Sequence, residues 1–189
     1  GRHLADSTRV QRQGNDSHAP AREWLVVFNP GNDAAELAVT FYFESASPKI
    51  VPLNVPPHSS TNLAVHESVP SGSRYGTRVR SNRPVVVQSS RGEYLPNNIV
   101  TQAMASRTGY PGPLGKRETR WTYADGLVLD NDTPLLEWEW ISIVNPAPKP
   151  AQIRLRFETA GKVADHLFMV DAERMATINL AMLPVFPKN

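Results

Sequence analysis

The chain has 189 residues, of which 40% are hydrophobic and 20% charged, and its formal net charge at pH 7 is +2. This composition is typical of a globular protein, and so small a charge argues against a nucleic-acid-binding role. Because the sequence has no cysteine, disulfides, thiolate metal ligands and cysteine nucleophiles are excluded. No apolar run reaches the roughly 18 residues that a membrane-spanning helix needs.

In chain order, the first clear elements are strands at residues 24–28 and 36–44, separated by the turn sequence Asn29-Pro30-Gly31-Asn32. We expect these two strands to pair as a hairpin. In the second strand, apolar side chains at every other position predict one buried and one exposed face. The buried set is Leu37, Val39, Phe41 and Phe43, and the exposed set is Glu36, Ala38, Thr40 and Tyr42.

More short strands bounded by turns follow. Residues 49–55 are expected at a sheet edge, because Pro52 has no N–H for a ladder hydrogen bond. Residues 98–106 predict a strand, with a one-turn helix as the alternative. This density of short strands predicts an antiparallel β-sandwich. The other strands of this half are expected at residues 61–65, 77–80 and 84–88.

Glycine and proline gather in Gly109–Gly115 and predict a linker over residues 111–119. We therefore divide the chain into a complete β-sandwich unit at residues 1–110 and a second, incomplete β unit at residues 120–189. The strands of the second unit are expected at residues 135–144, 151–159, 162–171 and 176–180.

The two units share a signature. Trp24-Leu-Val-Val-Phe-Asn-Pro30 returns as Trp140-Ile-Ser-Ile-Val-Asn-Pro146, which is 116 residues later. The repeat predicts an all-β protein with two related antiparallel sandwich units in tandem. The second unit is the shorter one, because it has no counterpart of the strand at residues 84–88. We expect the first unit or a second chain to cover the edge left open. At the same spacing, Leu37, Val39 and Phe41 correspond to Ile153, Leu155 and Phe157.

Three further motifs are Val55-Pro56-Pro57, Ser81-Asn-Arg-Pro-Val-Val-Val-Gln88 with Arg91 after it, and Trp121-Thr-Tyr-Ala-Asp-Gly126. Their order along the chain resembles that of the sensory rhodopsin transducer family. The resemblance covers one unit at residues 1–110 and a second at residues 120–189. It implies an antiparallel sandwich that self-associates and that acts in binding or signalling through protein–protein contacts in an oligomer, without catalysis and without a cofactor. It implies a cytoplasmic location, whereas the tandem layout is similar to that of bacterial surface proteins.

Arginines gather in the first unit. Arg78 and Arg80 alternate with Val79 and so project from one strand face. Guanidinium groups bind phosphates, acidic glycans and acidic protein surfaces, although a solubilising outer face is the simpler interpretation. Nucleic acid is disfavoured because few aromatic residues lie among these arginines. The candidate binding residues are Arg78, Arg80, Arg83, Arg91 and Trp138.

The tryptophans support an alternative function, a carbohydrate-binding or surface-adhesion module. A sugar platform would expose at least two of them. Trp24 and Trp140 have apolar neighbours, so we expect both to pack in the core. Trp138 corresponds to Arg22 of the first unit and is expected to be exposed or to lie at an interface.

An enzymatic role would rest on Glu137 and Glu139, which lie about 7 Å apart along one strand face. That separation suits an inverting glycosidase, but nothing nearby predicts a cleft, so a solvated strand face is favoured. The five histidines never fall at metal-ligand spacing. We therefore expect neither an enzyme nor a metal site.

Overall fold

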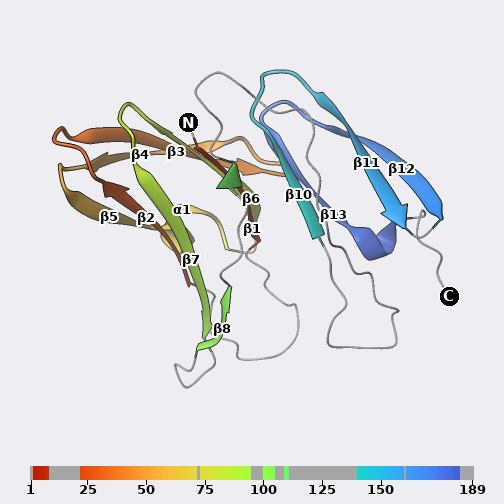
Figure 1. Ribbon diagram of the computed structural model, residues 1–189, viewed down its shortest axis with the longest axis horizontal. Coiled ribbons are helices and arrows are strands. Elements are labelled where there is room, and N and C mark those ends of the chain that lie inside the picture. The colour runs from red at the N-terminus through yellow and green to blue at the C-terminus, as the bar shows by residue number, and fades with distance from the viewer. Residues whose placement is uncertain are drawn as a thin grey trace.

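The computed structural model describes residues 2–8, 22–71, 73–94, 100–104, 109–110, 140–159 and 161–183. Most of them lie in strands (Figure 1), which confirms the all-β prediction. Apart from the turns between strands, the described residues form the helix α1 (Val65–Ser68) and the 3-10 turn η1 (Leu180–Met182). The strands are β1 (Arg2–Thr8), β2 (Arg22–Asn29), β3 (Ala35–Phe43), β4 (Lys49–Val55), β5 (Ser59–Ala64), β6 (Arg74–Ser81), β7 (Val86–Tyr94), β8 (Val100–Met104), β9 (Gly109–Tyr110), β10 (Trp140–Asn145), β11 (Ala151–Thr159), β12 (Lys162–Val170) and β13 (Arg174–Asn179).

The first unit is a sandwich of two antiparallel sheets. Sheet A has the strand order β4-β3-β6-β1-β9, and sheet B has the order β5-β2-β7-β8. Strand β4 lies at an edge, as Pro52 predicted, and residues 100–104 form a strand rather than a helical turn. The edge position of β4 follows from its backbone donors, since proline can lie only where no ladder hydrogen bond is needed.

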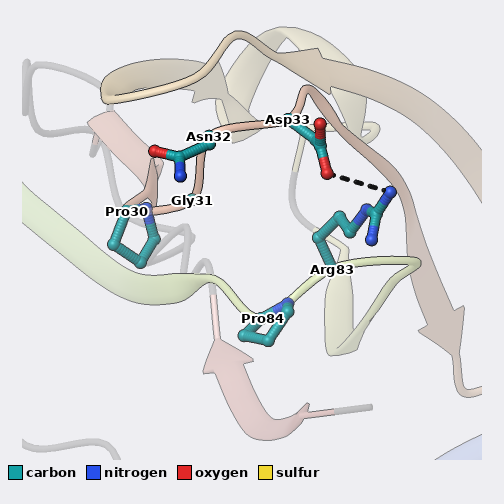
Figure 2. Close-up of a pocket in the computed structure, with 6 residues that line it drawn as sticks. All are labelled: Pro30, Gly31, Asn32, Asp33, Arg83 and Pro84. Carbon is teal, nitrogen blue, oxygen red and sulfur yellow. Dashed lines mark ion pairs between the residues drawn. The ribbon is translucent and has the colours of Figure 1, made fainter.

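The predicted hairpin between β2 and β3 is wrong. Strand β2 pairs with β5 and β7 in sheet B, whereas β3 pairs with β4 and β6 in sheet A. The connection at residues 30–34 therefore crosses from one sheet to the other, beside the β6–β7 connection (Figure 2). Each strand has an apolar face, and two such faces are best buried when they oppose each other across a sandwich.

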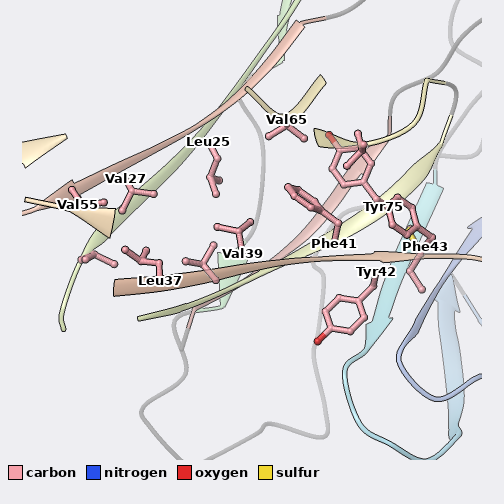
Figure 3. Packing of buried hydrophobic residues seen from close by; sticks show 14 of the residues in the cluster. Leu25, Val27, Leu37, Val39, Phe41, Tyr42, Phe43, Val55, Val65 and Tyr75 are labelled. Atoms are coloured by element: carbon pink, nitrogen blue, oxygen red, sulfur yellow. The ribbon is translucent and has the colours of Figure 1, made fainter. Parts of the chain in front are cut away.

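The core of the first unit lies between sheets A and B. Figure 3 shows Leu25 and Val27 of β2 pointing toward Leu37 and Val39 of β3. These side chains are at most 5% exposed. Close packing of this kind stabilises a side chain by about 1.5–3 kcal/mol relative to its exposed state.

The side chain of Asn29 ties the sheet crossing to the next turn. It is fully buried, and its Nδ2 donates to the carbonyl oxygens of Asp33, Val55 and Pro56 at 2.8, 3.0 and 3.1 Å. Its Oδ1 accepts from the backbone N–H of Gly31. One side-chain amide thus hydrogen-bonds to four backbone groups.

Asn145 makes the same contacts in the second unit. Its Nδ2 donates to the carbonyl oxygens of Lys149, Val170 and Asp171, and its Oδ1 accepts from the N–H of Ala147. A residue with positive φ lies in the turn after the equivalent strands β4 and β12, His58 at 50° and Glu173 at 53°. The repeated tryptophan-to-proline signature therefore codes for one repeated local structure.

Strand pairing repeats as well. Strand β10 pairs with β13 as β2 pairs with β5, and β11 pairs with β12 as β3 pairs with β4. Registers also match: Leu37 faces Leu53, and its counterpart Ile153 faces Phe168. The described part of the second unit thus reproduces four strands of the first, in keeping with two related units in tandem.

The strands form successive layers (Figure 1). The β10–β13 pair lies against the face of sheet A that points away from sheet B, and the β11–β12 pair forms the last layer. Val144 and Met175, which face each other across β10 and β13, contribute to the same hydrophobic cluster as sheet A. Contact is so close that a Cβ on Gly76 would lie 2.0 Å from Cγ2 of Val144.

This layer corrects the prediction that β3 is half-buried. Tyr42 points to the opposite side of β3 from Phe41 (Figure 3), yet both are buried, and so is Thr40. The predicted alternation of faces is right, but the second unit removes the outer face from solvent.

Candidate functional site

The structure separates the two arginines of β6 by their surroundings. Arg78 and Arg80 share the outer face of sheet A, opposite Thr40 and Ala38 in register. Arg80 is exposed, whereas Arg78 is only 9% exposed, and its Nε has no hydrogen-bond partner. The predicted basic face is therefore interrupted at Arg78, which is buried.

Arg83 lies in the β6–β7 connection and forms an ion pair with Asp33, with 3.1 Å between Nη2 and Oδ2. The two residues, with Pro30 and Pro84, line a shallow open hollow at one end of the sandwich (Figure 2). Both partners are exposed, so the pair contributes at most about 1 kcal/mol. The neighbouring Asn82 exchanges hydrogen bonds with the backbone of Glu36, which gives the Ser81–Gln88 motif a structural role.

Two predicted binding residues cannot be placed. Strand β7 includes Arg91, opposite Glu23 in register, but its side chain lies outside the part that the structure describes. Trp138 lies outside the described residues altogether, as do the linker at 111–119, Trp121 and the carboxylates Glu137 and Glu139.

Trp24 does not lie in the buried core. It points to the opposite side of β2 from Leu25 and is half-buried. Its ring packs edge-to-face against the imidazole of His66, with 5.3 Å between the ring centroids. The core prediction for Trp24 is wrong because the alternation along β2 assigns the interior to Leu25 and Val27. The side chain of Trp140 is outside the described set.

A buried polar cluster in the sandwich was not predicted. Glu23 is only 4% exposed. It accepts hydrogen bonds from the hydroxyls of Tyr75 and Ser89, which satisfy a carboxylate that would otherwise be costly to bury. A signal was present, since Glu23 lies two residues before Leu25 and four before Val27 and so shares their inward phase.

His66 of α1 fastens the helix to this strand. Its Nδ1 lies 3.0 Å from the carbonyl oxygen and 3.3 Å from the backbone nitrogen of Glu23. Since Tyr75, Ser89 and the imidazole all converge on one residue, the cluster positions α1 and β6 against β2.

The outer face of the β11–β12 pair exposes large apolar side chains. Val163, Leu167 and Met169 alternate along β12 and are 63, 58 and 56% exposed. Charged side chains of β11 lie beside them, Arg154 opposite Leu167 and Glu158 opposite Val163. Apolar exposure of this kind on a sheet face is typical of protein interaction surfaces.

An ion pair lies in the middle of this face. Arg156 donates two hydrogen bonds to Asp165, at 2.9 and 3.0 Å. These hydrogen bonds hold the pKa of Asp165 below its usual value and raise the pKa of Arg156. The bidentate geometry fixes the two side chains relative to each other.

The described residues thus offer contact surfaces. They contain no group of three or more potential metal ligands, and none of their helices is long and apolar enough to cross a membrane.

Residues 6–111 match the family described as Anabaena sensory rhodopsin transducer. Among solved structures, the chain resembles Thermotoga maritima 1070, with 25% identity, a TM-score of 0.46, and coverage of 58% of this chain and 91% of that one. It also resembles the Anabaena sensory rhodopsin transducer, with 20% identity, a TM-score of 0.39, and coverage of 46% and 82%. Among curated proteins, none matches. Since the matched residues are more than half of the chain, it belongs to the Anabaena sensory rhodopsin transducer family.

Proposed function

We propose that this transducer-like protein is a non-enzymatic signalling module that acts through protein–protein contacts in an oligomer, with the outer face of β11–β12 as the contact between two copies. The observation that carries the proposal is the exposure of Val163, Leu167 and Met169 on the last layer of the molecule. Membership of a transducer family supports a signalling role for such a contact.

The charges of this face favour a second copy as the occupant. Arg154 lies on one side of the Arg156–Asp165 ion pair and Glu158 on the other, two residues away along β11 in each direction. A two-fold axis across the strands near Arg156 would place Arg154 of one copy over Glu158 of the other, at both ends at once. Leu167 of each copy would then cover Val163 of its partner.

Sedimentation velocity over a concentration series tests the contact. We expect the chain to associate and Leu167→Asp to weaken association at least tenfold, because a carboxylate would be desolvated at the centre of an apolar contact. The matched control is Ile50→Asp, which changes a side chain of similar exposure (64%) in the first unit and should leave association unchanged.

A charge exchange between Arg154 and Glu158 tests the proposed pairing of these residues across the contact. Arg154→Glu should weaken association, and the double variant Arg154→Glu with Glu158→Arg should restore it, because the exchanged charges are again complementary. A chain that stays monomeric at the highest concentration, or an association that Leu167→Asp leaves intact, would overturn the proposed contact.

The division of the chain also remains a proposal. We propose a complete unit at residues 1–110, a linker at 111–119 and a second unit at 120–189. Four repeated strands in matching register support it. Limited proteolysis should cut first between residues 111 and 119 and release a fragment of the first unit.

A further inference from the structure

The outer face of sheet A changes from buried to exposed along β3 and β6. Successive pairs of opposing residues follow this direction: Tyr42 with Gly76, Thr40 with Arg78, and Ala38 with Arg80. Both members of the first two pairs are buried, whereas Ala38 is half-buried and Arg80 is exposed. Arg78 thus belongs to the last buried row of the face, and Arg80 belongs to the first row that solvent reaches.

The guanidinium group of Arg78 has no partner in the described part of the chain. The residue is 9% exposed, and its Nε is enclosed without a hydrogen bond. Neither Nη group has a hydrogen bond or an ion pair there, and neither is enclosed as Nε is, so solvent reaches both. Since arginine cannot be deprotonated in proteins, a positive charge is held in a partly buried place, where water screens it weakly.

Arg80 places a second positive charge beside the first. It projects from the same face two positions further along β6, about 7 Å away along the strand. The next residue of this face on β3 is Glu36, but among the described residues neither arginine forms an ion pair with this or another carboxylate. A buried charge without a counter-charge is costly, and two like charges this close also repel each other. The face therefore favours an anion with two negative charges.

We infer that Arg78 and Arg80 form a binding site for a phosphate monoester. Such a group carries close to two negative charges at pH 7, which matches the two guanidinium groups, whereas a single carboxylate would leave one of them without a partner. Guanidinium N–H groups donate to phosphate oxygens in pairs. Thr40 lies opposite Arg78 in register, and its hydroxyl supplies a further donor.

The two arginines contribute differently to this site. Arg78 is almost enclosed, so salt screens its attraction for the phosphate much less than it screens an exposed pair. Arg80 is exposed and attracts the anion from solution. The order of burial along β6 therefore gives the site a sheltered inner end and an open outer end.

This inference goes beyond the proposed function and does not depend on it, because the arginines lie on β6 of the first unit and the oligomer contact lies on β11 and β12. The two can fail separately, since Leu167→Asp alters the oligomer contact and leaves both arginines unchanged.

An NMR titration of the full chain with methyl phosphate tests the site. We expect saturable shifts with one phosphate per chain in the side-chain Nε–H signals of Arg78 and Arg80. The backbone amides of residues 38–40 and 78–80 should shift with the same midpoint. Shifts that do not saturate, or that are largest in another part of the chain, would overturn the inference.

Two ligand controls test the requirement for a double negative charge. Dimethyl phosphate carries one charge and should bind at least tenfold more weakly than methyl phosphate. The affinity for methyl phosphate should rise severalfold as pH passes upward through its second pKa of about 6, whereas sulfate keeps two charges and should bind equally on both sides of that pH. Equal binding of the two phosphates would contradict a site for a monoester.

The source of the monoester is distinguished by a phosphoserine peptide with glycine on both sides. Binding equal to that of methyl phosphate would show that the phosphate group alone is read, as for a small phosphorylated molecule. Binding at least tenfold tighter would assign the site to a phosphorylated side chain of a partner protein. A peptide that fails to bind where methyl phosphate binds would restrict the site to small molecules.

Variants of the chain test the two arginines directly. Arg78→Gln and Arg80→Gln should each weaken the binding of methyl phosphate at least tenfold, and Arg80→Gln changes only an exposed side chain, so the fold is retained. The control is Lys149→Gln, which removes an exposed positive charge in the second unit and should leave the affinity unchanged. If all three variants weakened binding equally, the anion would be attracted by the overall charge, and the assignment of a site would be wrong.

Discussion

At the scale of single residues, one buried asparagine makes the same backbone hydrogen bonds in each unit. The sequence shows Asn29 and Asn145 before proline in a repeated signature, and this predicts a turn in both places. It does not predict that the side chain enters the core and binds carbonyl groups from a connection 26 residues away. Such a role depends on which turns meet in space, and local sequence patterns do not contain that information.

We predict that Asn29→Ala destabilises the protein by about 3 kcal/mol, because three carbonyl oxygens and one N–H lose their partner in a buried site. Asn145→Ala should act in the same direction. Chemical unfolding followed by circular dichroism measures both. Asn54→Ala, on the exposed side of edge strand β4, should change stability by less than about 0.5 kcal/mol. Equal effects of Asn29→Ala and Asn54→Ala would show that the side-chain network is unimportant.

At the scale of elements, the strands could be predicted and their partners could not. Alternation of apolar and polar residues predicts β3 and β11 well, because a period of two is a property of one strand. Pairing depends on the other strands that compete for each edge, which is why the hairpin between β2 and β3 was wrong. Glu23 shows the same limit, since its phase along β2 was visible but its partners Tyr75 and Ser89 lie 52 and 66 residues away.

The β11–β12 ion pair makes a prediction about pH. Hydrogen bonds from Arg156 lower the pKa of Asp165 in the folded protein, so the pair stabilises the fold above the ordinary carboxyl pKa of about 3.9. This contribution is lost as pH falls through the lowered pKa of the folded state. An NMR titration of the Asp165 carboxyl should show a midpoint below that of an unfolded peptide.

Two variants separate the causes of this shift. Arg156→Gln should return the pKa of Asp165 toward its ordinary value, because the hydrogen-bond donor is gone. Arg154→Gln should have a smaller effect, since Arg154 acts only through its charge. If both variants moved the midpoint equally, charge alone and not the bidentate contact would account for the shift.

At the scale of the whole molecule, the tandem arrangement could be predicted but the stacking could not. Repeats at a fixed spacing indicate two copies of one unit. The second copy covers the outer face of sheet A because the two surfaces fit each other, and Gly76 leaves room there for Val144. The two candidate arginines on this face differ in burial, since Arg78 is buried and Arg80 is exposed.

We predict that Gly76→Ala destabilises the protein by about 1–3 kcal/mol, the usual cost of overpacking. The new Cβ would lie 2.0 Å from Cγ2 of Val144, and a β-branched side chain has few rotamers available for escape. Chemical unfolding of a double-mutant cycle with Val144→Ala measures the coupling. In the Val144→Ala background, Gly76→Ala should cost clearly less. A cost that is the same in both backgrounds would mean that the two units do not meet at Gly76.

The contact between Val144 and Gly76 also gives the molecule a direction. Val144 is the counterpart of Phe28, so the second unit uses the outer surface of its sheet-B-like pair, whereas the first unit uses the outer surface of sheet A. The contact therefore joins two different kinds of surface. The surfaces at the two ends of the stack also differ, since one is the outer surface of sheet B and the other is the outer surface of the sheet-A-like pair. A third copy of the unit joined by the same contact would lengthen the stack into a rod whose two ends differ. A symmetric contact between two units would instead have used the same surface on both and left none for a third.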